Sequence, residues 1–188
     1  MIIHKLFPTV IGEFDLSTCY DPLQVKSFLD SYNTKTHSLV PNGISSYTSG
    51  QSLLTEFELN SLNDHFQNCV DSYAEQTSLE PMYISNSWFN KLTKGSRTTL
   101  HRHEGSVLSG AFYPYADNNS ISLSFRSPLR PHRMNDLFTS TNHLNSDFES
   151  FPAKVGTLYL FPSWLEHETD INQSNERYVI SFNTGRIS

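Results

Sequence analysis

The sequence predicts a mainly β domain with flanking helices, built as a two-sheet sandwich or jelly roll, an architecture that includes the cupin-like barrels. Three observations lead to this fold class. From residue 82 onward, short runs rich in aromatic and β-branched residues alternate with Gly, Pro, Asn and Asp. Before residue 80, apolar residues recur mainly at spacings of three and four, which indicates helices. The 188 residues suit one folding unit, so we expect a single domain over 1–188.

Residues 1–80 are expected to form mostly helical cover over the β core. A short helix should run from Asp21-Pro22 to about Asn33, because proline is tolerated at the first helical position. A longer amphipathic helix is expected from about Thr55 to Gln76, with an apolar stripe that packs against a sheet. Between them, the Ser-, Asn- and Gly-rich stretch 34–51 predicts a loop that could cover the mouth of a site, with a short strand near Tyr47.

The β core is expected over residues 82–184. Its strands should lie near residues 82–92, 97–103, 107–115, 121–126, 153–161, 164–170 and 176–184. The stretch 127–150 is polar and has no clear period, so we expect an insertion loop there, with its two histidines exposed to solvent.

Composition excludes several kinds of partner. The formal net charge is −6 and the basic residues are scattered, so we expect no nucleic-acid partner. No apolar stretch approaches the roughly 18 residues of a membrane helix, and we expect a cytoplasmic protein with no membrane contact. Cys19 and Cys69 have no metal-binding spacing and predict no disulfide framework. An exposed edge of such a sandwich favours a homodimer.

The strongest chemical signal is the pair His101 and His103. Residues two apart on a strand project from the same face and can share one metal ion. His167, 66 positions later, would complete a set of three ligands that leaves coordination positions open, as catalytic sites do. Arg177 follows ten positions after His167 on the last predicted strand, where its guanidinium could bind a carboxylate.

This order of ligands resembles the superfamily of 2-oxoglutarate- and iron(II)-dependent oxygenases. The sequence is similar, more closely, to a group of oxygenases from phages and marine bacteria, and Leu6-Phe7-Pro8 resembles the opening of that group. The densest matches are Trp88-Phe89-Asn90, His101-Arg102-His103, Ser109-Gly110, Phe161-Pro162-Ser163-Trp164-Leu165-Glu166-His167, and Arg177 with Ser181-Phe182-Asn183. For a phage-encoded protein the location would be the host cytoplasm.

The resemblance implies a double-stranded β-helix core and the cofactors of these enzymes. His101, His103 and His167 would hold Fe(II), and Arg177 would pair with the distal carboxylate of 2-oxoglutarate. With O2, 2-oxoglutarate would be decarboxylated to succinate while an unidentified protein, peptide or small-molecule substrate is hydroxylated.

Two positions depart from the pattern of the superfamily. A carboxylate usually stands where this chain has His103, and Glu104 is the nearest carboxylate, so His103 ranks above Glu104 as the second ligand. Many members have a serine two residues after the arginine, where this chain has Val179. A hydroxyl from Tyr113, Tyr159 or Ser181 would have to replace it.

Substrate contacts are expected from Trp88, Asn90 and Arg126. An apolar wall around the metal would come from Trp88, Phe112, Phe161 and Trp164. Trp88 and Trp164 could instead be core anchors, which is the commoner role of tryptophan in small β folds.

Other functions remain open from the residues alone. Gly95 followed by His101-x-His103 also looks like the start of a cupin motif, and three histidines suit a zinc hydrolase with Glu104 as general base. A non-enzymatic β-sandwich that acts as an interaction module would bind no metal. Arg177 could then form a surface ion pair with one of the nearby carboxylates, Glu166, Glu168 or Asp170.

Overall fold

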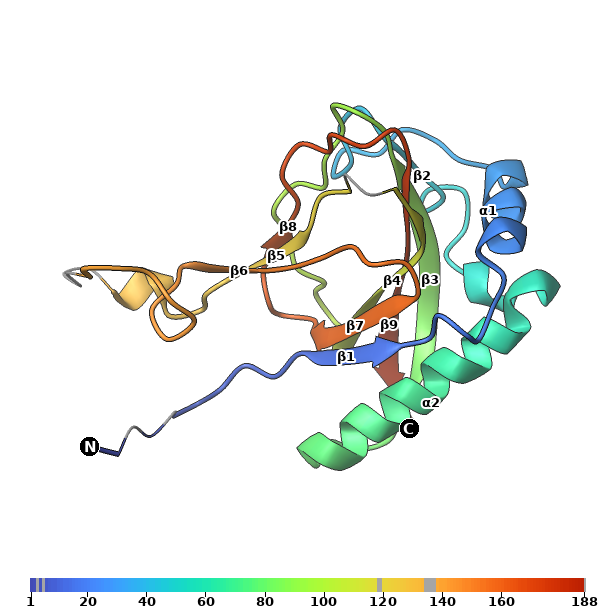
Figure 1. Cartoon of the computed structure of the whole chain (residues 1–188). Helices are drawn as coiled ribbons and strands as arrows, with labels where there is room; N and C mark the ends of the chain where they lie inside the picture. The colour runs from blue at the N-terminus through green and yellow to red at the C-terminus, as the bar shows by residue number, and fades with distance from the viewer. Residues whose placement is uncertain (3, 5, 118–119, 134–137, 188) are drawn as a thin grey trace.

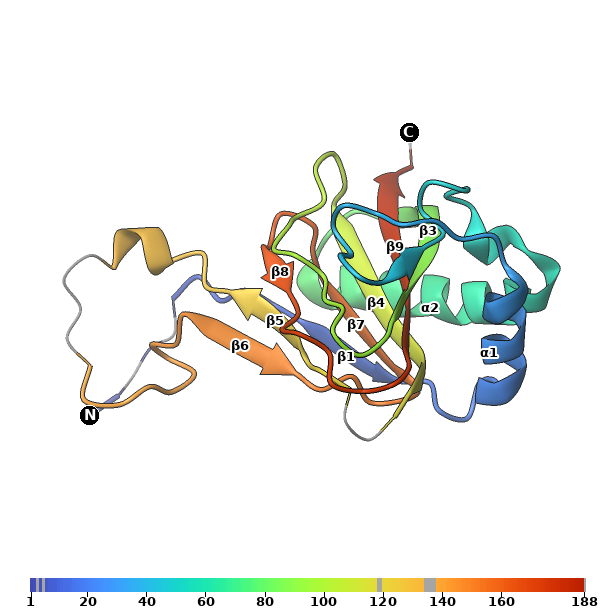
Figure 2. The same ribbon diagram turned by 90° about the horizontal axis from the view of Figure 1, so that it is seen from above.

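Two antiparallel β-sheets form the body of the molecule (Figures 1 and 2). The structure is a computed structural model that describes the chain except residues 3, 5, 118–119, 134–137 and 188. The larger sheet has the strand order β1-β7-β4-β9-β3-β2 and the smaller one β6-β5-β8. The strands are β1 Gly12–Asp15, β2 Ile44–Ser45, β3 Met82–Leu92, β4 Leu108–Ala116, β5 Leu123–Arg126, β6 Phe148–Phe151, β7 Thr157–Pro162, β8 His167–Glu168 and β9 Arg177–Arg186. The predicted β core with flanking helices is confirmed.

The two α-helices cover one face of the larger sheet (Figure 1). Helix α1, Pro22–Ser31, begins as predicted, because the Asp21 side chain accepts hydrogen bonds from two backbone N–H groups of its first turn. Helix α2, Asn60–Thr77, begins five residues later than predicted, since two short 3-10 turns precede it. Neither helix in the described part of the chain could span a bilayer.

Strand β9 separates the two cores of the molecule. Its residues Tyr178, Ile180 and Phe182 are fully buried against the helices. The alternate residues, among them Val179, face the space between the two sheets, where a second apolar cluster lies. Side chains on this inner face of β9 therefore point into the interior of the sandwich, where a site can be shielded from water.

The predicted strand over 97–103 is wrong. In that segment only His101 makes a β-bridge, to His167, and the rest is irregular. Gly95 has a left-handed backbone (φ +86°), and the amides that follow bond to loops, for example Thr99 N to Leu39 O at 2.9 Å. Apart from the bridge between His101 and His167, the backbone hydrogen bonds of this segment thus go to loop partners instead of a ladder. The strand predicted over 164–170 is likewise reduced to β8.

Three further expectations change in detail. Strand β7 begins at Thr157, four residues later than predicted, because Gly156 (φ +83°) ends a turn there. The strand expected near Tyr47 is β2, two residues long. The stretch 127–150 leaves the body between β5 and β6 (Figure 2), but it contains the 3-10 turn Arg130–His132 and ends in β6. Its residues 134–137 lie outside the described part of the chain, and its two histidines are exposed as predicted.

A cluster of charges attaches α1 to the larger sheet. Asp30 accepts hydrogen bonds from Lys26 (2.7 Å), Lys91 (2.8 Å) and the Tyr178 hydroxyl, and Glu176 pairs with the same two lysines. Burial raises the pKa of Asp30, but these hydrogen bonds outweigh it and hold the pKa well below its ordinary value. The ionised carboxylate therefore stabilises the fold.

The free energy of unfolding of Asp30→Asn at neutral pH should be about 0.5–1 kcal/mol lower than that of the wild type. The expected effect is small because the cluster is partly exposed. The folded-state pKa is depressed, so this difference should be fully present above about pH 3.9 and shrink as the pH falls further. Urea unfolding at pH 7, 5 and 3 measures it. An equal difference at pH 7 and pH 3 would contradict an electrostatic origin.

Candidate metal centre and cavity

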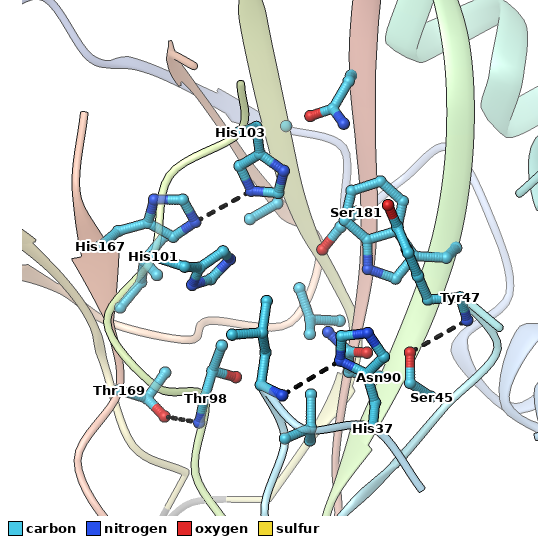
Figure 3. Close-up of a pocket in the computed structure, with 18 of the residues that line it drawn as sticks. His37, Ser45, Tyr47, Asn90, Thr98, His101, His103, His167, Thr169 and Ser181 are labelled. Atoms are coloured by element: carbon cyan, nitrogen blue, oxygen red, sulfur yellow. Dashed lines mark hydrogen bonds between the residues drawn. The ribbon is translucent and has the colours of Figure 1, made fainter. Parts of the chain in front are cut away.

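Three histidines meet between the two sheets (Figure 3). His167 begins β8, and its backbone exchanges two hydrogen bonds with that of His101, at 2.9 and 3.0 Å. The backbone N–H of His103 donates to Ser163 O at 2.9 Å and holds this residue in place. One candidate ligand atom from each ring lies within 4.8 Å of the others. The sequence spacing predicted this trio, although the segment that carries His101 and His103 is not a strand.

Backbone carbonyls fix the tautomers of two of these rings. His101 Nδ1 lies 2.8 Å from Thr99 O, and His167 Nδ1 lies 2.9 Å from Leu165 O. A carbonyl oxygen can only accept, so each Nδ1 carries the hydrogen and donates it. The Nε2 atom of each neutral ring is left with a free lone pair, which is the form that binds a metal.

Burial keeps the three rings neutral. It lowers the pKa of His101, and it lowers the pKa of His103 to about 4, with His101 adding to the effect. The pKa of His167 lies well below its ordinary value, first because the ring is buried and then because His101 is close. Neutral imidazoles compete poorly for protons and are available to a cation at neutral pH.

The spacing of the rings fits one shared metal ion. His103 Nε2 and His167 Nε2 lie 3.3 Å apart. Metal–nitrogen bonds of about 2.1 Å at right angles would place neighbouring ligand nitrogens about 3.0 Å apart. Glu104 is different: its side chain is 80% exposed and pairs with Arg102 at 3.1 Å. The geometry therefore favours His103 over Glu104 as the second ligand.

A cavity of about 550 Å³ opens beside the trio and contains the guanidinium of Arg177 at its inner wall. Arg177 is only 1% exposed, and its Nη2 donates to the Tyr113 hydroxyl at 3.3 Å. Its Nε and Nη1 have no hydrogen-bond partner among the described residues. Burial lowers the pKa of Arg177, but a guanidinium stays charged in proteins.

The ion-pair alternative for Arg177 is wrong. Among the described residues, no ion pair includes it, and Glu166 pairs with Arg126 at 3.5 Å. A buried charge without a counter-ion costs several kcal/mol unless something pairs with it. The cavity is therefore built to admit an anion next to Arg177.

The other predicted site residues divide into two groups. Tyr113, Ser181, Trp88 and Asn90 all line the cavity. Tyr159 does not, because its hydroxyl donates to Pro152 O at 3.0 Å within the apolar core. This corrects the expectation that it assists Arg177.

Arg126 also lies elsewhere than expected. It pairs with Glu166 and lines a smaller hollow beside β6, outside the cavity of the histidine trio. The structure thus gives it no contact with a substrate in that cavity.

The predicted apolar wall is only half correct. Trp88 and Phe161 line the cavity. Phe112 is fully buried on the opposite face of β4, against the helices, because it alternates with the cavity residues Ala111 and Tyr113. Trp164 is 53% exposed in the turn before β8, so it is neither wall nor core anchor.

Residues that the sequence did not identify complete the mouth of the cavity. His37 and Tyr47 come from the loop that was expected to cover a site, and their rings pack edge to face at 5.2 Å. Asn86 lies two residues before Trp88 on β3 and also lines the cavity. The prediction of a covering loop pointed to the region, but no spacing singled out these side chains.

A histidine trio and an unpaired buried guanidinium in one cavity define a metalloenzyme that binds an anionic ligand near its metal. Residues 86–183, slightly more than half of the chain, match the model of the family described as "Putative 2OG-Fe(II) oxygenase". The chain belongs to this family. It is an enzyme that uses Fe(II), 2-oxoglutarate and O2, and this decides against the cupin-type, zinc-hydrolase and non-enzymatic alternatives.

Solved structures share the fold at low sequence identity. A prolyl-4-hydroxylase from Pseudomonas putida is 10% identical over 96% of this chain and 94% of its own, with a TM-score of 0.64. HygX from Streptomyces hygroscopicus, solved with nickel and 2-oxoglutarate, is 13% identical over 95% and 83%, with a TM-score of 0.64. A viral collagen prolyl hydroxylase from Paramecium bursaria Chlorella virus-1 is 9% identical over 94% and 96%, with a TM-score of 0.61. No curated protein matches the sequence significantly. The likeness confirms the double-stranded β-helix.

Proposed function

We propose that this enzyme hydroxylates a peptide or small-molecule substrate at the cavity beside the histidine trio. His101, His103 and His167 would hold Fe(II), and Arg177 would bind the distal carboxylate of 2-oxoglutarate. The bound metal and 2-oxoglutarate supply the oxidising chemistry, in which 2-oxoglutarate is decarboxylated to succinate as the substrate gains a hydroxyl group. A structurally similar prolyl hydroxylase from Trichoplax adhaerens was solved in complex with a peptide fragment, which supports a peptide as one class of substrate.

One observation carries the assignment of residues. The buried guanidinium of Arg177, whose Nε and Nη1 have no partner among the described residues, lies in the same cavity as three neutral imidazoles. Each imidazole places a candidate ligand atom within 4.8 Å of the others. A dianionic ligand that reaches from the metal to Arg177 satisfies both, because carboxylates pair strongly with guanidinium. Tyr113, which already accepts from Arg177, holds the guanidinium in place. Its hydroxyl would replace that of the serine that many superfamily members have at the position of Val179.

The chain's own residues position the reactants and exclude water. The carbonyls of Thr99 and Leu165 orient two ligand rings, which preserves the direction of their lone pairs. Phe161 and Phe125 pack on the buried ring of His167, at 4.8 and 6.0 Å between ring centroids. This apolar surround keeps the local dielectric constant low and strengthens the pairing at Arg177.

Anaerobic titration of the Fe(II)-loaded protein with 2-oxoglutarate tests the assignment without a substrate. The bidentate chelate should give a weak visible charge-transfer band. In Arg177→Ala the band should require at least roughly 30-fold more 2-oxoglutarate, since truncating one partner of a buried charge pair costs about 2 kcal/mol or more. Fe(II) binding itself should be unchanged in this variant.

Arg130→Ala is the matched control, because Arg130 is exposed, pairs with Asp147 at 3.5 Å and does not line the cavity. It should titrate like the wild type. If Arg177→Ala also titrates like the wild type, Arg177 does not bind the co-substrate and the proposal fails.

We also propose the narrower relation to oxygenases of phages and marine bacteria, with the host cytoplasm as the location. Its support is the resemblance of Leu6-Phe7-Pro8 and of the block from Phe161 to His167 to that group. A single domain over the whole chain is likewise proposed, since both apolar clusters share strands of the larger sheet. A homodimer, expected from an exposed sheet edge, and the lack of a nucleic-acid partner, expected from charge and composition, stay predictions.

A further inference from the structure

A stripe of three residues on β3 forms one wall of the cavity. Asn86, Trp88 and Asn90 alternate along the strand, so their side chains share the face that lines the cavity. The Trp88 ring packs against His103 at 5.6 Å and against Tyr47 at 5.1 Å. Figure 3 shows Asn90 across the cavity from the histidine trio. A molecule in the cavity therefore contacts this stripe while it lies beside the candidate metal ligands.

Two amide oxygens of the stripe have no hydrogen-bond partner. Asn90 is 8% exposed, and its Oδ1 is buried and unpartnered within the described part of the chain. The same holds for Oδ1 of Asn86, whose Nδ2 donates to Gln51 Oε1 at 2.9 Å. Leaving a buried acceptor unpaired destabilises a folded protein. Two acceptors left unpaired on one face indicate a ligand that brings hydrogen-bond donors.

The cavity has no free charge for the substrate once Arg177 is occupied. The other charged side chains of its lining are Arg102 and Glu104, which pair with each other at the exposed rim. The three candidate ligand histidines are neutral, and the rest of the wall consists of amide, hydroxyl, aromatic, aliphatic and small side chains, with the imidazole of His37 at the mouth. A charged group would lose its hydration here without gaining a counter-ion.

We propose that Asn86, Trp88 and Asn90 are the substrate-recognition surface of this enzyme, and that the substrate is uncharged where it enters. It presents donors, either amide N–H or hydroxyl groups, to the two asparagine oxygens and an apolar face to the indole. Four residues of extended strand separate the two asparagines by about 13 Å, so a ligand that contacts both is elongated. This inference rests on the proposed function, which places the metal and the co-substrate in the same cavity.

Fluorescence of Trp88 gives a test that does not depend on turnover. The chain has two tryptophans, and Trp164→Phe removes the exposed one, which lies outside the cavity lining. The protein would be loaded with Zn(II) and 2-oxoglutarate, which give no oxidation. The probes are acetyl-Ala-Ala-Ala-amide, a neutral methyl maltoside, and two charged tripeptides with Glu or Lys in the middle.

The neutral probes should change the emission of Trp88 saturably, and the charged tripeptides should bind roughly tenfold more weakly or not at all. Binding by the peptide identifies amide donors, and binding by the glycoside identifies hydroxyl donors; either result supports the proposal. Equal binding of neutral and charged tripeptides, or no saturable response to either neutral probe, would overturn it.

Variants of the two asparagines test the contacts themselves. Asn86→Ala and Asn90→Ala should each weaken binding of the neutral probe roughly threefold to tenfold, the effect of one lost hydrogen bond. Asn175→Ala, an exposed amide outside the cavity, is the control and should bind like the parent. Unchanged probe binding in both cavity variants would overturn the proposal, as would an Asn90→Ala variant that loses affinity only for 2-oxoglutarate.

Failure of this inference can be separated from failure of the proposed function. The charge-transfer titration with Fe(II) and 2-oxoglutarate reports the metal and Arg177 alone. If that band forms normally and the asparagine variants bind the probes like the parent, only the recognition surface is wrong. If the band never forms, the proposed function is wrong whatever the probes do.

Discussion

Removing His167 should abolish tight iron binding. His167→Ala and His103→Ala are each expected to bind Fe(II) at least roughly 100-fold more weakly than the wild type, because loss even of a group that only orients a ligand costs 10- to 100-fold. His167 is 5% exposed and fixed through Leu165 O, and among the described residues the potential metal-binding group consists of His101, His103 and His167 alone. Competition with a coloured chelator under anaerobic conditions measures the affinity.

Glu104→Ala and His143→Ala are the matched controls for this experiment. Glu104 is the competing carboxylate, and it points to solvent beside Arg102. His143 is an exposed histidine in the stretch between β5 and β6 and does not line the cavity. Both variants should retain the affinity of the wild type. A loss in Glu104→Ala together with full affinity in His103→Ala would show that the carboxylate is the second ligand.

The trio could be predicted from the sequence because its chemistry is local. Two histidines two residues apart, a third on another predicted strand and an arginine ten residues later restrict the choice to few residues. The prediction identified the right side chains but assigned two of them to a strand, whereas the 97–103 segment is irregular. Its backbone bonds run to Leu39 and Thr169, which lie about 60 residues before it and about 70 after it, and no local pattern reveals such partners.

Long strands with clear alternation could also be predicted. Strand β3 has the predicted bounds, and β4 and β9 differ from their predicted bounds by one or two residues. The short edge strand β1 could not, because Gly and Asp disfavour strands and its partner β7 lies more than 140 residues later. The predicted direction of two side chains was wrong. Strand alternation was not applied to Phe112, and Trp164 lies in a turn, where alternation does not hold.

The recognition surface could not be predicted from the sequence. Asn86 and Asn90 are ordinary strand residues in the sequence, and only burial shows that their amide oxygens have no partner. His37 is a lone histidine 64 positions before His101, and it reaches the cavity only because β2 and the bridge between Lys35 and Ser45 fold its loop onto β3. Such residues require the tertiary structure.

Phe182 and Gly110 lie at the apolar core between the larger sheet and the helices, and neither should tolerate substitution. Phe182 is fully buried and stacks on Phe66 at 5.4 Å, so Phe182→Ala should lower the free energy of unfolding by about 3–5 kcal/mol. Gly110 lies opposite Phe182 across the β4–β9 ladder, and a Cβ there would come within 2.3–2.8 Å of three ring atoms. Gly110→Ala should therefore cost about 1–3 kcal/mol through overpacking.

A double-mutant cycle separates the two causes. In the pair Gly110→Ala with Phe182→Ala, the ring that crowds the added methyl group is absent, so the combined loss should be smaller than the sum of the single losses by about 1 kcal/mol or more. Gly50→Ala is the control, since a Cβ there meets nothing within 4 Å, and its stability should be unchanged. Denaturant unfolding measures all four variants. If the two single losses simply add, the contact between the ring and position 110 carries no energy. The glycine would then be required only for its backbone conformation.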